Sequence, residues 1–230
     1  MTFRRSCAAL LLGILGTSWF AATDAAAVAR SRAAVVETTA CGNASKTDGV
    51  AVLLGGSEVL VAAHVVIGAG SVTVDLGAGP LPANVVVLDQ RADLALLDVP
   101  SVDAPAISIA DPIDGDAVTI GLGTGEVIEA AITRLVEVRI EAVRSTERIS
   151  RFGFEIDRRV DLGDSGAGVY NASGELVGMV FGRSATRPDR SFAVRSEEVR
   201  QVRSQMTQKF VCVAAEDRVL SADTNEHADD

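Results

Sequence analysis

The stretch Gly163–Gly168 reads GDSGAG and directly follows the short segment VDL. A serine between glycines in such a turn is typical of an exposed nucleophile with backbone N–H groups gathered around it. Upstream, His64 lies in the string VAAHVV, and Asp93 lies in the string RADLALL. A serine hydroxyl needs a neighbouring base, and that base needs an orienting carboxylate. The pattern therefore predicts one nucleophilic site built from His64, Asp93 and Ser165.

Each of these residue types has a defined chemical task. Asp93 would accept a hydrogen bond from one ring nitrogen of His64, which leaves the other nitrogen to take the Ser165 proton. The negative charge that develops on the attacked carbonyl oxygen needs preorganised donors. The backbone N–H groups of Gly163 and Ser165 are the natural pair, and a side chain at Gly163 would restrict the backbone and crowd the carbonyl.

The composition favours a globular chain made of strands. Hydrophobic residues make up 48% of the 230 residues and charged residues 23%, so a packed core is expected. Only 4% are aromatic, so Val, Ala, Leu and Ile must fill that core. The formal net charge of −10 argues against nucleic acid or an anionic membrane surface as a partner, because both require concentrated Lys and Arg.

Short apolar runs separated by glycine-rich or acidic turns predict two groups of strands. The first group comprises residues 50–54, 59–66, 71–76, 83–88 and 94–99, with a hairpin turn at Gly55-Gly56-Ser57. The second comprises residues 117–122, 127–138, 152–156, 168–170, 176–181 and 191–194. The proline-rich segment 100–116 connects them, and 171–175 is a turn.

One helix is predicted after the last strand. Ser196 can cap it, two glutamates favour its positive end, and Val199, Val202 and Met206 have helical spacing. Residues 216–230 are acidic and are expected to form a disordered tail. Two groups of strands followed by one helix indicate an all-β fold, either two small barrels or a sandwich.

The N-terminal residues 1–27 are interpreted as a signal peptide. Arg4 and Arg5 precede an apolar run, and Ala25-Ala26-Ala27 supplies small residues for cleavage. The alternative is an uncleaved N-terminal anchor, although the run is shorter than the ~20 residues of a spanning helix. We expect an exported protein, periplasmic or secreted, with no stable membrane insertion once the signal is removed.

Cys41 and Cys212 remain after the signal, which carries Cys7. An even pair of cysteines in an exported chain suggests a disulfide that ties the N-terminal region to the C-terminal one. The alternative is two free thiols.

The order His, Asp, Ser and the strings VAAHVV, RADLALLDV and GDSGAG resemble the trypsin/chymotrypsin superfamily, most closely bacterial HtrA-type and related exported serine peptidases. The resemblance covers roughly residues 35–205 and implies two perpendicular six-stranded antiparallel β-barrels, a C-terminal helix and an active site in the cleft between the barrels. It places His64 and Asp93 in an N-terminal barrel (28–105) and Ser165 in a C-terminal barrel (106–210). It also implies proteolysis through an acyl-enzyme on Ser165.

The chain departs from the family pattern at several points. Ala167 stands where the family usually has glycine, and no cysteine follows His64 to form the disulfide of animal members. No Ile-Val-Gly-Gly-like start is visible, so Asp164 is expected to make a local turn contact instead of pairing with a new N-terminus. Too few residues follow Val194 for a PDZ-like domain.

The resemblance also suggests where a substrate would bind. The specificity pocket is expected to be lined by residues just before the nucleophile, by the Val180–Gly182 strand and by the segment near Ser191. Arg159 falls near the base of this pocket and could favour acidic side chains, or it could point to the surface. Phe181 and Gly182 fit a strand that pairs with extended peptide backbone.

The resulting hypothesis is an exported serine endopeptidase that acts on protein or peptide substrates without a cofactor or metal. With one histidine outside the tail, the sequence offers no metal-ligand cluster. A rival is a binding or regulatory module that keeps the fold but has little or no turnover, and an esterase could use the same three residues. The sequence indicates no oligomeric state.

Overall fold

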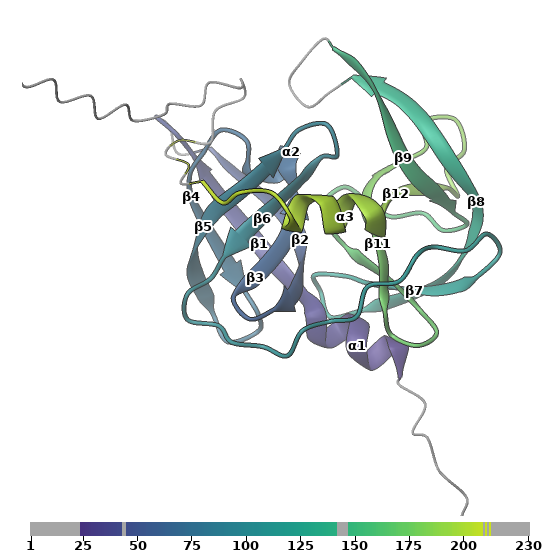
Figure 1. Cartoon of the computed structure of the whole chain (residues 1–230), viewed down its shortest axis with the longest axis horizontal. Coiled ribbons are helices and arrows are strands. Elements are labelled where there is room, and N and C mark those ends of the chain that lie inside the picture. The colour runs from purple at the N-terminus through teal and green to yellow at the C-terminus, as the bar shows by residue number, and fades with distance from the viewer. Residues whose placement is uncertain (1–23, 43–44, 142–146, 209, 211, 213–230) are drawn as a thin grey trace, which may run out of the picture.

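The computed structural model describes residues 24–42, 45–141, 147–208, 210 and 212. Most of the expected signal peptide and the acidic tail lie outside this range. The described chain forms two closed, six-stranded antiparallel barrels side by side (Figure 1). This confirms the all-β prediction and decides between barrels and a sandwich.

The first barrel has the strand order β1-β2-β3-β6-β5-β4. Its strands are β1 (Ala33–Ala40), β2 (Lys46–Gly55), β3 (Glu58–Ala62), β4 (Ala69–Asp75), β5 (Pro80–Asp89) and β6 (Leu94–Asp98). Five of them match predicted runs, and the hairpin turn lies at Gly55-Gly56 as expected. β1 was not predicted, because its sequence AAVVETTA mixes apolar and polar residues and is bounded by no clear turn. Its buried residues alternate, as in a strand with one face toward the core.

The second barrel has the strand order β10-β11-β12-β9-β8-β7. Its strands are β7 (Ala117–Gly121), β8 (Val127–Glu141), β9 (Arg148–Ile156), β10 (Gly168–Asn171), β11 (Leu176–Arg183) and β12 (Ser191–Arg195). Each overlaps a predicted run, although β7 ends at Gly121, one residue before the end of the run predicted for it. The predicted turn between β10 and β11 is closed by Asn171, whose side-chain oxygen accepts from the N–H groups of Ser173 and Glu175, both at 3.0 Å.

The segment that carries His64 differs from the prediction of one strand over 59–66. β3 ends at Ala62, and residues Ala63–Val66 form the short helix α2. β-branched residues favour a strand here, but contacts from Asp93 override this preference. The Asp93 carbonyl accepts from the Ala63 N–H at 3.0 Å, and the Asp93 carboxylate accepts from the His64 N–H at 3.0 Å.

Two further helices link the barrels, because each is next to one barrel in the sequence and packs against the other. Helix α1 (Ala25–Arg32) precedes the first barrel but packs against β7 and β10 of the second. Ala29 is fully buried in this contact, where its carbonyl leaves no room for a side chain at Gly121. Helix α3 (Ser196–Arg203) follows the second barrel but packs against β5, β6 and β11, between the two barrels (Figure 1).

Helix α3 corrects two details of the predicted helix. Its N-cap is Arg195, without a side-chain cap, while the Ser196 hydroxyl donates to Asp111 at 3.2 Å. The helix ends at Arg203, so Met206 lies beyond it and is 87% exposed. Arg203 instead anchors the helix, donating twice to the Glu58 carboxylate of β3 at 3.0 and 2.6 Å.

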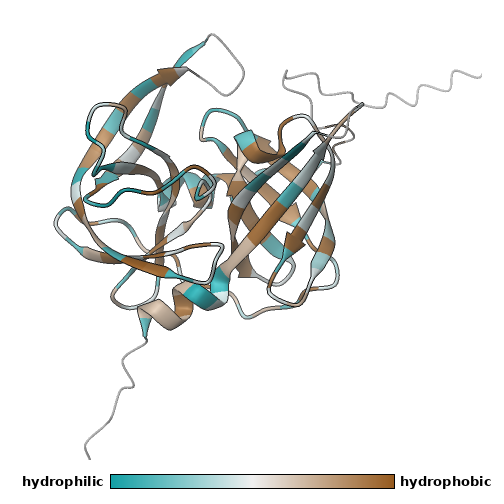
Figure 2. Ribbon diagram, turned by 180° about the vertical axis from the view of Figure 1, so that it is seen from behind, coloured by the Kyte–Doolittle hydropathy of each residue, from teal (hydrophilic) through white to brown (hydrophobic). Residues whose placement is uncertain are grey.

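Hydrophobic residues follow the strands of both barrels, while polar residues dominate many of the connecting loops (Figure 2). The cores consist largely of Val, Leu, Ile and Ala, as the low aromatic content requires. The first core also takes in Val199 and Val202 of α3, and the second takes in Val50 of β2. Each core is therefore completed by the other half of the chain. Among the described residues, no helix has the length and apolarity needed to span a bilayer.

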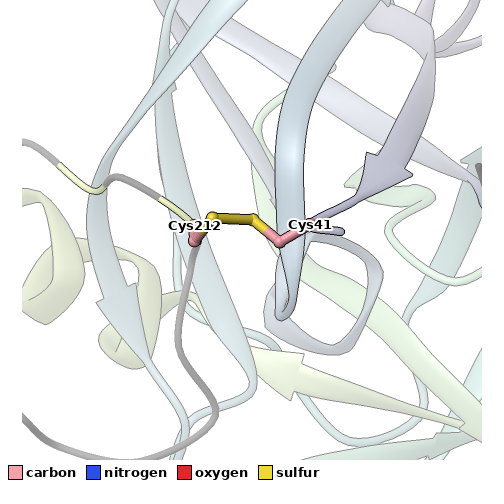
Figure 3. Close-up of a disulfide and its surroundings, with 2 residues drawn as sticks. All are labelled: Cys41 and Cys212. Atoms are coloured by element: carbon pink, nitrogen blue, oxygen red, sulfur yellow. A yellow bond between two sulfur atoms is a disulfide. The ribbon is translucent and has the colours of Figure 1, made fainter. Parts of the chain in front are cut away.

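The structure pairs Cys41 with Cys212 in a disulfide, with the two Cα atoms 5.7 Å apart (Figure 3). The bond closes a separation of 171 residues and joins the end of β1 to the segment after α3. It fastens the C-terminal end of the described chain to the first barrel.

We expect a digest of the protein made under non-reducing conditions to contain a linked peptide pair carrying Cys41 and Cys212. Reduction should convert that pair into two peptides and lower the free energy of unfolding by about 4–5 kcal/mol, because the unfolded chain regains the entropy of a long loop. Mass spectrometry and chemical denaturation measure the two effects. Full alkylation of both cysteines without reductant would contradict the pairing.

Candidate active site

The turn that carries Ser165 is docked onto the first barrel. The Ser165 carbonyl accepts a hydrogen bond from the Val50 N–H of β2 at 3.0 Å. On its own side, the Gly166 N–H donates to the Val180 carbonyl of β11 at 2.8 Å. Ser165 is therefore held between a strand of each barrel, with its side chain half-buried.

Gly166 allows this close approach. A Cβ atom there would lie 1.8 Å from the Val50 carbonyl oxygen, and its φ of +98° also disfavours any other residue. Ala167 is fully buried in the second core, and its carbonyl accepts from the Val180 N–H at 2.8 Å. The methyl group that replaces the family's usual glycine thus packs inside the barrel.

The rest of the turn leaves two N–H groups available. The Asp164 carboxylate accepts from the Asp161 N–H at 2.8 Å, which is the local turn contact predicted for it. Gly163 has a φ of +104°, and open space surrounds the position of a Cβ there. Within the described chain, the N–H groups of Gly163 and Ser165 make no hydrogen bond. Both are therefore available to donate a hydrogen bond to an oxyanion.

Asp93 holds His64 by both its backbone and its ring. One carboxylate oxygen accepts from the His64 N–H at 3.0 Å and lies 3.1 Å from Nδ1, and the other oxygen lies 2.9 Å from Nδ1. This leaves Nε2 as the free ring nitrogen. The His64 side chain is 34% exposed, and that of Asp93 only 5%. The pair thus joins a buried acceptor to a base that faces solvent.

The backbone of Asp93 adopts an uncommon conformation that the neighbouring turn holds in place. Its φ of +58° lies in the left-handed region, which aspartate tolerates better than most residues. The preceding turn is fixed by Asp89, whose carboxylate accepts from the N–H groups of Arg91 and Ala92 at 3.0 and 2.9 Å. Strained residues persist where the surroundings over-determine them, commonly at functional sites.

Ser165 and His64 come from opposite barrels, and the backbone next to Ser165 lies close to the end of the strand that precedes His64. The Ala62 N–H, two residues before His64, lies 3.6 Å from where a Cβ on Gly166 would stand. Among the described residues, no hydrogen bond joins the two side chains. Catalytic hydrogen bonds are often long in the free enzyme and tighten on binding substrate.

The expected substrate-binding residues have distinct environments. Arg159 and Arg183 line a cavity of about 270 Å³ together with Ser184, Ala185 and Pro188. The Arg159 side chain is 54% exposed, so more than half of it remains in contact with solvent. Ser191 is fully buried, and its hydroxyl accepts from the Val160 N–H at 3.0 Å, so it anchors the loop just after Arg159.

Phe181 and Gly182 lie where β11 passes beyond the turn that carries Ser165. β10 pairs with β11 only up to the pair Gly168↔Met179, and the turn occupies Val180. On the other side of β11, Gly182 pairs with Phe192. The edge of β11 that faces the turn is therefore unpaired at Phe181 and Gly182 in the described structure. Apart from its two chain neighbours, no described residue has a heavy atom within 4 Å of where a Cβ on Gly182 would stand.

The family model of the trypsin-like peptidase domain matches residues 49–179, more than half of the chain. The chain belongs to this family. Its relatives include the serine protease Rv3671c of Mycobacterium tuberculosis, 30% identical over 159 residues, and the putative serine protease HhoB of Synechocystis, 29% identical over 158 residues. Each match covers 66% of this chain and only 40% and 38% of the respective relative.

Solved structures agree with this assignment. The Rv3671c protease in its active form superposes with a TM-score of 0.75 at 26% identity, covering 83% of this chain and 88% of that one. An inactive form of that protease gives 0.64 at 28% identity, covering 77% and 89%. The HtrA-type protease AlgW with a tripeptide shares the fold, with a TM-score of 0.65 at 24% identity over 78% and 61%.

Sequence reasoning missed two charged side chains buried in this peptidase domain. Glu155 of β9 is 2% exposed and is surrounded by Arg134, Arg187 and Arg190. Burial opposes its charge, but hydrogen bonds from Arg134, Thr133 and Arg187 hold its pKa below the ordinary value. Arg151, also of β9, lies 3.6 Å from the Asp93 carboxylate. A pattern such as RISRFGFEI predicts a strand but does not reveal which charges it buries.

Substituting Gly166 by Ala should lower the free energy of unfolding by about 3 kcal/mol or more, because a strained φ and a backbone clash act together. The matched control is Gly163→Ala, which has a similar φ but open space around it. It should cost about 1–2 kcal/mol. Chemical denaturation of both variants measures the difference. Equal losses would mean that the Val50 contact does not constrain the turn.

Proposed function

We propose that this protein is an exported serine endopeptidase in which Ser165 is the nucleophile, His64 the general base and then acid, and Asp93 its orienting partner. The observation that carries the proposal is the Asp93 carboxylate bound to both the His64 N–H and Nδ1, which leaves Nε2 as the base. Membership of the trypsin-like peptidase family supports it.

The proposed reaction proceeds in two halves. The Ser165 Oγ attacks the carbonyl carbon of the peptide bond while His64 Nε2 takes its proton. The N–H groups of Gly163 and Ser165 donate to the resulting oxyanion. Collapse breaks the C–N bond, and the imidazolium gives its proton to the leaving amine. Water, deprotonated by His64, then attacks the acyl-enzyme and releases the carboxylic acid with restoration of the Ser165 hydroxyl.

Three features of the turn support readiness for this chemistry. The two N–H groups of the proposed oxyanion hole are unengaged, the turn is docked on β2, and the buried Ala167 leaves the site unobstructed.

The mature protein should react with a fluorophosphonate probe, and Ser165→Ala and His64→Ala should abolish or nearly abolish labelling, since one removes the nucleophile and the other its base. Gel fluorescence measures the reaction. Ser173→Ala, which changes an exposed serine in the β10–β11 turn, is the matched control and should label like the parent. An unlabelled parent would favour a binding module that keeps the fold without turnover.

We further propose that Arg159 selects an acidic side chain next to the cleaved bond, and that Phe181 and Gly182 pair with the substrate backbone. The cavity lined by Arg159 and Arg183 supports the first part, and the unpaired edge of β11 supports the second. Asp161 lies 2.9 Å from Arg159 and 3.9 Å from Arg183, so a substrate carboxylate would compete with it.

Arg159→Gln should lower kcat/KM for peptides with an acidic residue at that position by about two- to tenfold, while neutral peptides change less, because an exposed ion pair contributes modestly. The matched control is Arg158→Gln. Arg158 is exposed to a similar extent, 52% against 54%, but it lines a different cavity and pairs with Asp157. Equal effects of the two substitutions would contradict a specific role for Arg159.

We propose export through the signal sequence expected in residues 1–27. The Cys41–Cys212 disulfide supports it, because such bonds persist in oxidising compartments. Residues 1–23 lie outside the described structure. Ala25–Ala27 form the first turn of α1, and the Asp24 carboxylate accepts from the Ala26 and Ala27 N–H groups at 3.0 and 3.3 Å. A cut after Ala27 would remove this cap and turn.

A further inference from the structure

Arg151 reaches from the second barrel into the environment of Asp93 in the first. It lies on β9, and its side chain is only 2% exposed. Its Nη1 lies 3.6 Å from Asp93 Oδ2, and its Nε donates to the Arg91 carbonyl at 3.1 Å. The guanidinium therefore contacts both the carboxylate that holds His64 and the turn that carries that carboxylate.

This position is costly for a cation. Nη2 is buried without a hydrogen-bond partner in the described structure, and burial lowers the pKa of Arg151. The guanidinium carbon lies 4.9 Å from the centre of the Phe181 ring, a cation–π contact that compensates part of the lost hydration. Burying an incompletely bonded charge lowers stability. Such groups cluster at functional sites, where their charge is needed.

We infer that Arg151 is a positioning residue of the catalytic site: it fixes the Asp93 carboxylate toward His64 and makes this arrangement depend on the docking of the second barrel. The inference rests on the proposed function. The Arg151 side chain contacts both Asp93 and Phe181, and Phe181 is proposed to pair with the substrate backbone.

The two carboxylate oxygens of Asp93 have different neighbours. Oδ1 accepts from the His64 N–H and lies 3.1 Å from Nδ1, while Oδ2 lies 2.9 Å from Nδ1 and 3.6 Å from Arg151 Nη1. Without the guanidinium, nothing among the described contacts holds Oδ2 except the imidazole that it must orient. Only the hydrogen bond from the His64 N–H to Oδ1 would then restrain rotation about the Cβ–Cγ bond, so the orientation of the His64 ring would be less well fixed for proton transfer.

The charge of Arg151 has a separate effect on the base. A fixed positive charge beside Asp93 opposes the charging of His64, because like charges repel through a partly buried site. Removing that charge should therefore make imidazolium easier to form. The acid limb of the pH profile of kcat/KM, where the base becomes protonated, would move to higher pH.

Other charges face Arg151 and belong in this account. Asp89 of the first barrel and Glu198 of α3 also act on the guanidinium, as does Asp93. Burial and the neighbouring carboxylates of Asp89 and Glu197 raise the pKa of Glu198, whereas Arg151 and Arg195 oppose that rise. Losing Arg151 would raise it further. Each Arg151 substitution is therefore also made together with Glu198→Gln, which removes the titration of Glu198 and leaves that of the base.

The test compares Arg151→Met and Arg151→Gln, which remove the charge, with Arg151→Lys, which keeps it. In both neutral variants we expect kcat to fall about tenfold with KM little changed. The acid limb should rise by about half to one pH unit, also in the Glu198→Gln background. Arg151→Lys keeps the positive charge, so its acid limb should stay at the parent position. If Arg151 had a purely structural role, the acid limb would not depend on whether the substituted side chain is charged.

The matched control is Arg195→Met. Arg195 also lies over a phenylalanine ring, that of Phe152 at 5.8 Å, and donates to the Gly153 carbonyl at 3.2 Å, but it does not contact Asp93. Its substitution should leave the acid limb in place. Thermal unfolding checks that every variant is folded, and titration with the fluorophosphonate probe measures the fraction of reactive sites. If Arg151→Met does not fold, the comparison is made with Arg151→Gln.

Two outcomes would overturn the inference alone: a labelled parent whose neutral variants keep its acid limb and kcat, or an Arg151→Lys variant that shifts like the neutral ones. An unlabelled parent would overturn the proposed function and this inference with it.

Discussion

The candidate active site depends on the contact between strand β2 and the turn that carries Ser165. The strands of each closed barrel pair only with one another, so contacts other than strand pairing must fix one barrel against the other. The Val50 N–H meets the Ser165 carbonyl at 3.0 Å, and Gly166 has no room for a side chain against the Val50 carbonyl. This approach sets where Ser165 stands relative to the first barrel, and hence relative to His64.

Helices α1 and α3 also hold the two barrels together, although neither lies at the contact between Ser165 and Val50. α1 leaves the N-terminal side to pack on the second barrel, and α3 returns from the second barrel to the first. Arg203 binds Glu58, Gln205 binds Asp89 at 2.9 Å, and the disulfide fastens the following segment to the end of β1. Separating the barrels would therefore expose apolar surface from both helices.

The two buried carboxylates that the sequence did not reveal as such are each held against arginine side chains. Asp93 sits between His64 and Arg151, and Glu155 sits among three arginines. In a chain of net charge −10, these arginines are placed against specific carboxylates rather than spread over a basic surface. Such pairs contribute little net stability but fix geometry, which suits a site that needs one orientation of a base.

The sequence by itself determined the strand pattern, the turn at Gly163–Gly168 and the residues proposed for the chemistry, because period-two burial, glycine turns and nucleophile motifs are local in the chain. It missed β1, whose apolar face has meaning only against β2 and β4. It also assigned the His64 segment to a strand, although Asp93, 29 residues away, bends it into α2. Only the tertiary structure brought Arg151 to Asp93 and placed Ala167 in the core. Both are contacts between residues distant in the chain, and local propensity carries no information about such partners.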